Sequence, residues 1–146
     1  MAMGRPSTSS GNLRQAAKAT AAAAAELVLV SGGLGPTSDD RTREALAAAS
    51  GQALVFVQEI YDTIHATLRR RGATTREPHR DQARLPEGAS WLPNEEGVAV
   101  GVRVRVGEAT VLALPGVPRE LKAMFRREVV TLLPQTEVAT ASVFAT

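Results

Sequence analysis

The chain has 146 residues, a length typical of one domain with a hydrophobic core of its own. Hydrophobic residues make up 44% and charged residues 22%, and 17 Lys and Arg against 15 Asp and Glu give a net charge of +2 at pH 7. This near balance gives no reason to expect nucleic-acid binding. The lack of a long apolar run excludes a membrane-spanning helix, and the lack of cysteine excludes disulfides and thiolate metal sites and fits a cytoplasmic protein.

The first thirty residues divide into three parts of different composition. Residues 1–10 carry Ser, Gly and Pro with little that is apolar, which predicts a disordered tail before a domain over residues 11–146. Residues 11–25 are dominated by Ala and have a high intrinsic helix propensity. Residues 27–30 are apolar, rich in Val and too few for a helix, so they predict a fully buried strand.

A glycine-rich loop separates this strand from an Ala-rich helix that is predicted over residues 40–50. In α/β sheets ligands bind at the carboxyl ends of strands, and glycine lets the backbone approach a bound group closely. Exposed N–H groups at a helix start favour anions such as phosphate. The candidate phosphate-binding residues in this segment are Gly32, Gly33, Leu34, Gly35, Thr37 and Thr42.

Two neighbouring carboxylates, those of Asp39 and Asp40, stand between the loop and the helix and allow two interpretations. In the first interpretation they hold Mg²⁺ against a bound phosphate, because a hard cation takes oxygen ligands. Alternatively Thr37, Ser38 or Asp39 caps the helix, and Asp40 adds a favourable negative charge to its first turn. Spacing alone does not decide between them. The loop is not a P-loop, because no Lys-Ser/Thr follows its last glycine.

The middle of the chain predicts one clear helix and one long loop. An apolar patch over residues 53–57 leads into an amphipathic helix over residues 59–71, with Ile60, Ile64 and Leu68 on one face. Residues 73–88 are polar and contain prolines, so they predict a long irregular loop, which is often functional. The polar residues here and at Asn94 are either solvated loop residues or ligand contacts. As ligand contacts, Arg80 would clamp a phosphate, and Gln82 and Asn94 would hydrogen-bond a heterocycle.

The last third of the chain predicts a β-hairpin followed by a helix. Apolar and polar residues alternate over residues 98–106, and Gly107 and Glu108 turn the chain into a second strand over residues 109–114. A helix is predicted over residues 118–133, and residues 135–146 are a candidate edge strand. The tight loop between strand and helix is either a second anion site or a rigid turn, and its candidate residues are Pro115, Gly116 and Pro118.

Taken together, these segments resemble the molybdopterin-binding MoaB/Mog domain, in the version found in competence/damage-inducible (CinA) proteins. The loop SGGLGPTSDDRT over residues 31–42 is similar to that family's Gly-Gly-x-Gly-Pro-Thr-x-Asp-Asp-x-Thr segment. Shorter matches follow in the family's order: Gln82, LPEGA over residues 85–89, LPN ending at Asn94, the Gly97-x-Ala99-x-Gly101 spacing, and LPGVPRE ending at Glu120.

The resemblance implies an α/β fold, a three-layer α/β/α sandwich with a mostly parallel sheet and a β-hairpin, and a pocket for a phosphorylated pterin or nucleotide. In molybdenum-cofactor relatives the position of Asp40 serves the pterin–nucleotide chemistry. In CinA-type proteins the domain is associated with metal-dependent hydrolysis of ADP-ribose. Asp39 and Asp40 are then the expected catalytic and metal-binding residues, with Mg²⁺ or another divalent cation. The alternatives are a protein of molybdenum-cofactor biosynthesis, with molybdopterin as its ligand, and a non-catalytic binding module.

The chain departs from the family pattern in three places. A strand, a helix and a second strand that open the family domain are not recognisable before residue 11, and the C-terminal amidohydrolase domain of CinA proteins is not recognisable either. His79 stands where the family usually has Asn, and Asp81 where it usually has a basic residue. A sheet that lacks a strand leaves unpaired backbone edges, so we expect a partial domain that associates with itself as a homo-oligomer.

Overall fold

The structure, a computed structural model, describes residues 26–133 and 143–145, the last three by their backbone alone. The predicted tail and the predicted helix over residues 11–25 lie outside the described residues. Within the described part of the chain, no helix is long and apolar enough to cross a membrane.

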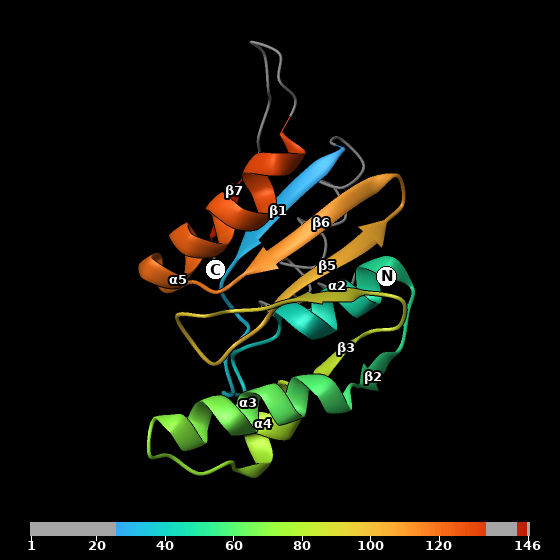
Figure 1. The fold of residues 1–146 in the computed structure, drawn as a ribbon. Coiled ribbons are helices and arrows are strands. Elements are labelled where there is room, and N and C mark those ends of the chain that lie inside the picture. The colour runs from blue at the N-terminus through green and yellow to red at the C-terminus, as the bar shows by residue number, and fades with distance from the viewer. Residues whose placement is uncertain (1–25, 134–142, 146) are drawn as a thin grey trace, which may run out of the picture.

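A five-stranded sheet with the strand order β4-β5-β6-β1-β7 forms the centre of the fold (Figure 1). β1 pairs in parallel with β6 and β7, whereas β5 pairs antiparallel with β4 and β6. The predicted buried strand, the hairpin and a C-terminal edge strand are therefore confirmed. The strands are β1 (Leu27–Ser31), β4 (Ser90–Leu92), β5 (Gly101–Val106), β6 (Ala109–Leu114) and β7 (Val143–Ala145).

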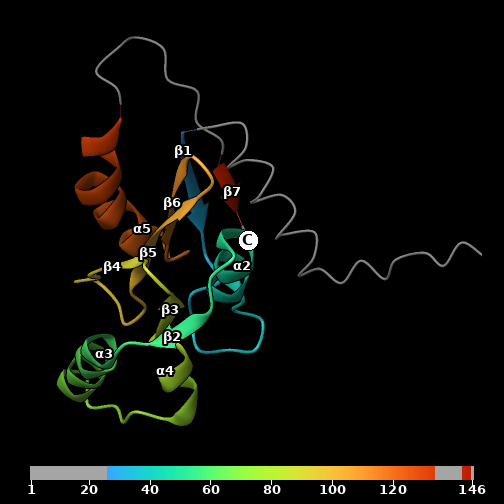
Figure 2. The ribbon, with the colours of Figure 1, turned by 90° about the vertical axis from the view of Figure 1, so that its right-hand side faces the viewer.

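Helices cover both faces of this sheet, α2 (Thr42–Ser50) on one and α5 (Pro118–Met124) on the other (Figure 2). After α5 the chain continues as a π-helical turn, Phe125–Val129, and a 3₁₀ turn, Val130–Leu132, so the predicted helical segment is present but changes its pitch. Alternate side chains of the strands enter two separate cores. Val28, Val30 and Val111 pack with Leu46 of α2, and Leu112 and Leu114 pack with Met124 and Val129. This arrangement is the expected three-layer sandwich.

A smaller unit lies beyond one end of the main sheet (Figure 1). Ile60, Ile64 and Leu68 are buried, as their spacing predicts, and they join the same core cluster as the valines of β5. The unit is therefore continuous with the main core. It consists of α3 (Gln58–Arg70), α4 (Glu77–Asp81) and the antiparallel pair β2 (Leu54–Phe56) and β3 (Arg84–Pro86).

The prediction of an irregular loop over residues 73–88 is wrong, because this segment contains α4 and β3. The ring of His79 accepts a hydrogen bond from the backbone N–H of Arg76, which stabilises the start of α4. β3 exists because it pairs with β2, a contact that local sequence does not encode. The strand predicted from residue 98 begins instead at Gly101, since the residues before it bend toward α5.

The predicted capping of α2 by Thr37, Ser38 or Asp39 is also wrong. Its N-cap is Arg41, which makes no side-chain cap bond, and the helix begins at Thr42 rather than at residue 40. Thr42 anchors this end to the glycine loop instead, since its Oγ1 donates to the Gly32 carbonyl at 2.8 Å and its N–H to the Gly33 carbonyl at 3.1 Å. The start of the helix is thus fixed by the loop that precedes it.

Candidate functional site

The two glycine-bearing loops meet at the carboxyl ends of β1 and β6. These strands are parallel neighbours, with Ser31 in register with Leu114. The N–H of Gly32 donates to the Leu114 carbonyl at 2.9 Å, and a Cβ placed on Gly116 would lie only 3.2 Å from the Cα of Gly32. Because a Cβ on Gly116 would crowd the Gly32 backbone, the two loops lie in close contact here, and their backbones form one continuous surface.

This surface forms one wall of a pocket of about 640 Å³, within the usual range for small-molecule sites. The opposite wall comes from the end of α3, from α4 and from the segment before β5. The lining is mixed, with both apolar and ionisable side chains. It consists of Gly32, Gly33, Leu34, Gly35, Pro36, Asp40, Arg71, His79, Gln82, Val98, Ala99, Pro115, Gly116, Val117 and Glu120.

Buried polar side chains hold the glycine loop from its inner side. Arg43, only 5% exposed, donates to the Leu34 carbonyl at 2.7 Å and to the Gly35 carbonyl at 3.1 Å. Gln82, 3% exposed, donates to the same Leu34 carbonyl at 3.1 Å. Burial lowers the pKa of Arg43, although neighbouring carboxylates oppose this effect. Because an arginine remains charged in proteins, this fork is a permanent clamp on the loop.

The conformation of the loop also requires glycine at position 33. Gly33 has φ +71°, in the left-handed region that side chains disfavour, and a Cβ there would collide with the Oγ1 of Thr42. The hydroxyl of Thr42 occupies that space and bonds the loop. The loop is therefore preorganised by contacts with the protein alone, and little of its conformation has to be fixed by a ligand.

Asp40 stands at the pocket end of this loop. Its Oδ2 accepts hydrogen bonds from the Oγ1 of Thr37 at 2.6 Å and from the N–H of Thr37 at 3.0 Å. Partial burial raises the pKa of the Asp40 carboxyl, but the bonds from Thr37 and Gly35 and the charge of Arg43 lower it by more. The net pKa lies below the ordinary value of 3.8, so Asp40 is a carboxylate at neutral pH.

A second carboxylate, that of Glu120, enters the pocket from the first turn of α5. It accepts a hydrogen bond at 2.7 Å from the amide of Asn94, which also donates to the Ala99 carbonyl at 2.8 Å. The carboxylate packs against the backbone of Gly97, where any side chain would overlap it. These contacts pull residues 94–99 toward α5 and so shape the wall that carries Val98 and Ala99.

The described residues contain no group of three His, Cys, Asp or Glu side chains placed to hold a metal ion. Asp39, one of the two predicted metal ligands, is exposed and does not line the pocket. Asp40 and Glu120 both do. Mg²⁺ is commonly held by one or two carboxylates together with substrate phosphates, so this donor set fits an ion that arrives with a phosphorylated ligand.

A family model described as "Probable molybdopterin binding domain" matches residues 9–135. The chain belongs to this molybdopterin-binding domain family. The CinA structure from Thermoplasma acidophilum, a protein described as of unknown function, aligns with a TM-score of 0.75 and 30% sequence identity, over 85% of this chain and 73% of that one. The resemblance inferred from the loop motifs is thereby confirmed, as is the fold.

Among curated relatives, a "Putative competence-damage inducible protein" from Geobacillus sp. (strain WCH70) is 40% identical over 115 residues, which are 79% of this chain and 27% of the relative. A "CinA-like protein" from Frankia casuarinae is 43% identical over 114 residues, 72% of this chain and 25% of the relative. The chain thus spans about a quarter of the length of the curated relatives that it matches.

The structure brings many of the predicted site residues of this molybdopterin-binding domain together in the pocket. Those that line it are Gly32, Gly33, Leu34, Gly35, Asp40, Gln82, Ala99, Pro115, Gly116 and Glu120. Two proposed ligand contacts lie elsewhere: the guanidinium of Arg80 stacks over Phe56, 4.6 Å from the ring centroid, and the amide of Asn94 is committed to Ala99 and Glu120. The others outside the lining are Thr37, Asp39, Thr42, Gly97, Gly101 and Pro118.

Three polar residues at the site were not predicted from the sequence. Arg43 lies on the same helical face as Leu46 and Ala47, and a charged residue on an apolar face was a usable signal. Arg71 is the last of three successive arginines at the end of α3, and His79 lies in the polar segment over residues 73–88. Neither has a local pattern that marks it, because only the packing of α3 and α4 beneath the loops brings them to the pocket.

Proposed function

We propose that the pocket binds the phosphate groups of a nucleotide or a phosphorylated pterin, and that with a divalent cation it hydrolyses the pyrophosphate of ADP-ribose. The observation that carries this proposal is the convergence of two preorganised glycine loops over the ends of adjacent parallel strands. Such loops suit an anionic ligand because they present backbone at close range without side chains. The pocket's volume is ample for a nucleotide-sized ligand.

The charges of the lining make the cation necessary in this proposal. The pocket has two carboxylates, Asp40 and Glu120, against one guanidinium, that of Arg71. A polyphosphate entering such a site meets a net negative charge, which disfavours binding unless another positive charge is added. Bound Mg²⁺ would supply that charge and polarise the phosphate oxygens. Asp40 suits holding the cation, since a carboxylate with a lowered pKa is a weak proton acceptor.

The reaction itself is a hydrolysis. Water attacks one phosphorus, the bridging P–O bond breaks, and ADP-ribose gives AMP and ribose 5-phosphate.

Calorimetric titration with ADP-ribose in MgCl₂ and then in EDTA tests the cation requirement, and product analysis tests turnover. Under the proposal ADP-ribose binds only with Mg²⁺, and Asp40→Asn abolishes turnover while the fold persists. Equal binding in EDTA contradicts the cation's role, and full turnover in Asp40→Asn removes Asp40 from the mechanism.

Molybdopterin is the second candidate ligand, favoured by the description of the matched family model. In that case the protein binds molybdopterin tightly and does not hydrolyse ADP-ribose. Assays with both ligands therefore separate the two functions. A chain that binds ADP-ribose without hydrolysing it is a non-catalytic binding module.

Self-association is a further part of the proposal. Among the strands that the structure describes, β4 ends one side of the sheet and pairs with β5 alone, which leaves a three-residue backbone edge for another chain. Sedimentation velocity over a range of protein concentrations tests this directly. A homo-oligomer is expected, and a monomer at every concentration contradicts it. A cytoplasmic location, proposed from the lack of cysteine, is tested by cell fractionation.

A further inference from the structure

Arg71 is the one Arg or Lys side chain among the described residues that lines the pocket. It directly follows α3 (Gln58–Arg70), and its N–H bonds back to the carbonyls of Thr67 and Leu68, so its backbone position is fixed by the end of the helix. Its guanidinium donates to the Glu96 carbonyl at 2.9 Å. Of the five N–H donors of an arginine, this contact uses one.

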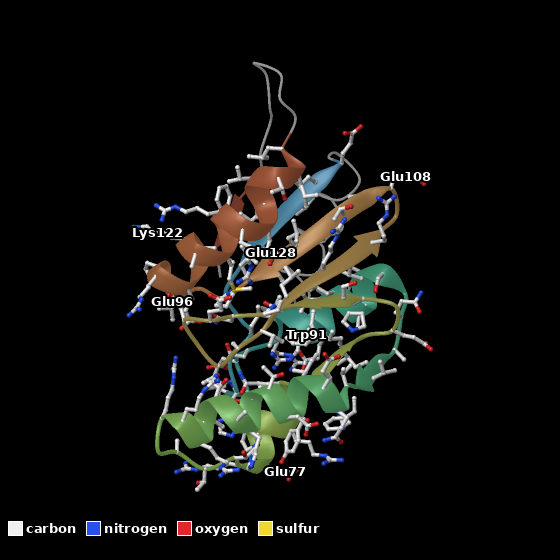
Figure 3. All side chains as sticks on the ribbon, viewed as in Figure 1. Glu77, Trp91, Glu96, Glu108, Lys122 and Glu128 are labelled. Carbon is white, nitrogen blue, oxygen red and sulfur yellow. The ribbon has the colours of Figure 1, made fainter. Side chains whose placement is uncertain are left out.

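No carboxylate among the described residues lies within ion-pair distance of Arg71. In contrast, each of four other arginines pairs with a carboxylate: Arg84, Arg105, Arg119 and Arg127. The neighbouring Glu96 does not pair with Arg71 through its carboxylate. Its carbonyl accepts the hydrogen bond from Arg71, whereas its carboxylate pairs with Arg119 on α5 at 2.5 Å. Figure 3 labels Glu96 beside the start of α5. The guanidinium of Arg71 is therefore held in place yet keeps its charge free for a ligand.

His79 adds a second donor to the same wall. Its Nδ1 accepts the backbone N–H of Arg76 at 2.9 Å, which requires Nδ1 to be unprotonated. The neutral ring then carries its proton on Nε2. The half-buried ring lines the pocket, and no described residue accepts a bond from Nε2. Arg71 and His79 together thus offer hydrogen-bond donors from the side of the pocket formed by α3 and α4.

We infer that Arg71 and His79 bind a second phosphate group of the ligand, so that the site selects diphosphates over monophosphates. This inference rests on the proposed function and specifies its substrate class. The glycine loops and Asp40 contact one phosphate with its cation, and the Arg71–His79 wall contacts the other. A planar guanidinium suits this task because its paired donors match two phosphate oxygens. A monophosphate placed at the loops leaves this wall without a partner.

The test compares the affinities for ADP-ribose, ADP and AMP, in MgCl₂, of the wild type, Arg71→Gln, Arg71→Lys and Arg69→Gln. Arg69 is an exposed neighbour that does not line the pocket, so Arg69→Gln removes the same charge from the same helix end. Arg71→Gln is expected to weaken ADP and ADP-ribose binding by about tenfold or more, the effect of losing one charge-assisted contact, and AMP binding by less than about threefold. The affinity of Arg71→Lys for ADP and ADP-ribose is expected to lie between those of the wild type and Arg71→Gln. Arg69→Gln is expected to bind all three ligands as the wild type does.

His79→Asn separates the ring's two roles, because the Asn side-chain oxygen can still accept the Arg76 N–H, whereas the shorter side chain places no donor where Nε2 stood. A smaller loss of ADP affinity, about threefold to tenfold, is expected with an unchanged melting temperature. An equal loss of AMP and ADP affinity in Arg71→Gln, or no loss, overturns the inference and leaves the proposed function standing. A wild type that binds none of the three ligands overturns the proposed nucleotide-binding function, and the inference with it.

Discussion

Gly116 and Gly32 lie far apart in the sequence, yet their backbones approach so closely that a Cβ on Gly116 would lie 3.2 Å from the Gly32 Cα. Gly116→Ala therefore pushes the two loops apart by a few tenths of an ångström. We expect a stability loss of about 1 kcal/mol and a several-fold weaker affinity for ADP-ribose. Denaturant titration and calorimetry measure the two effects. Unchanged affinity means that the close approach of the loops is irrelevant to the ligand.

Gly33 and Gly51 offer a matched pair for testing the loop anchor. Both have φ near +70°, but a Cβ on Gly51 would point into open space, whereas one on Gly33 would collide with Thr42. Each Gly→Ala change carries the cost of the left-handed backbone, about 1 kcal/mol. We expect Gly33→Ala to lower the free energy of unfolding by roughly 1–3 kcal/mol more than Gly51→Ala does. Equal losses in urea unfolding would show that the contact with Thr42 is unimportant.

Arg43 is predicted to act chiefly through the loop that it clamps. Arg43→Met retains a long side chain but leaves the Gly35 carbonyl without its buried donor, and Gln82 alone then holds Leu34. A loss of about 1–3 kcal/mol is expected, since the variant loses two charge-assisted bonds and leaves the part-buried Gly35 carbonyl unpaired. The exposed neighbour Arg41, changed to Met, serves as the control. Urea unfolding of both variants measures the difference, and equal stability in both refutes the clamp.

Asp40 gives the protein a defined pH dependence. Its folded pKa is lowered, so its contribution to stability is complete above the unfolded value of about 3.8 and is lost as the pH falls through the lower folded value. The wild type should therefore exceed Asp40→Asn in unfolding free energy at pH 6, and this difference should shrink below pH 4. Urea titrations at several pH values test this.

Asp39→Asn is the control for that series, because the Asp39 side chain is exposed and makes no hydrogen bond within the described part of the chain. It should follow the wild type at every pH. A difference between the wild type and Asp40→Asn that stays constant down to the most acidic pH would contradict the role assigned to the bonds from Thr37.

The parts of the fold that local pattern encodes were predictable from the sequence. The run of apolar residues over 27–30 predicts β1, and the spacing of Ile60, Ile64 and Leu68 predicts the buried face of α3. The alternation of Val102, Val104 and Val106 predicts the first strand of the hairpin. The meeting of the two glycine loops was also predictable, because loops at the ends of neighbouring parallel strands lie at one edge of the sheet.

The parts that depend on tertiary contacts were not predictable. β3 is a short strand that exists through its pairing with β2, and Thr42 starts α2 because the glycine loop accepts its hydrogen bonds. Arg80 stacks on Phe56 rather than reaching the pocket, whereas Arg71 reaches it from the end of a helix. Which of several arginines faces a pocket is decided by how the elements pack, and sequence spacing carries no signal for that.

The most direct test of the single pocket is an amide ¹H–¹⁵N NMR titration of the chain with ADP-ribose in MgCl₂. The account predicts that the signals of Gly33, Gly35 and Gly116 shift together and follow one saturation curve, because both loops contact the same ligand. Shifts confined to one loop, two curves with different midpoints, or shifts at neither loop would contradict it.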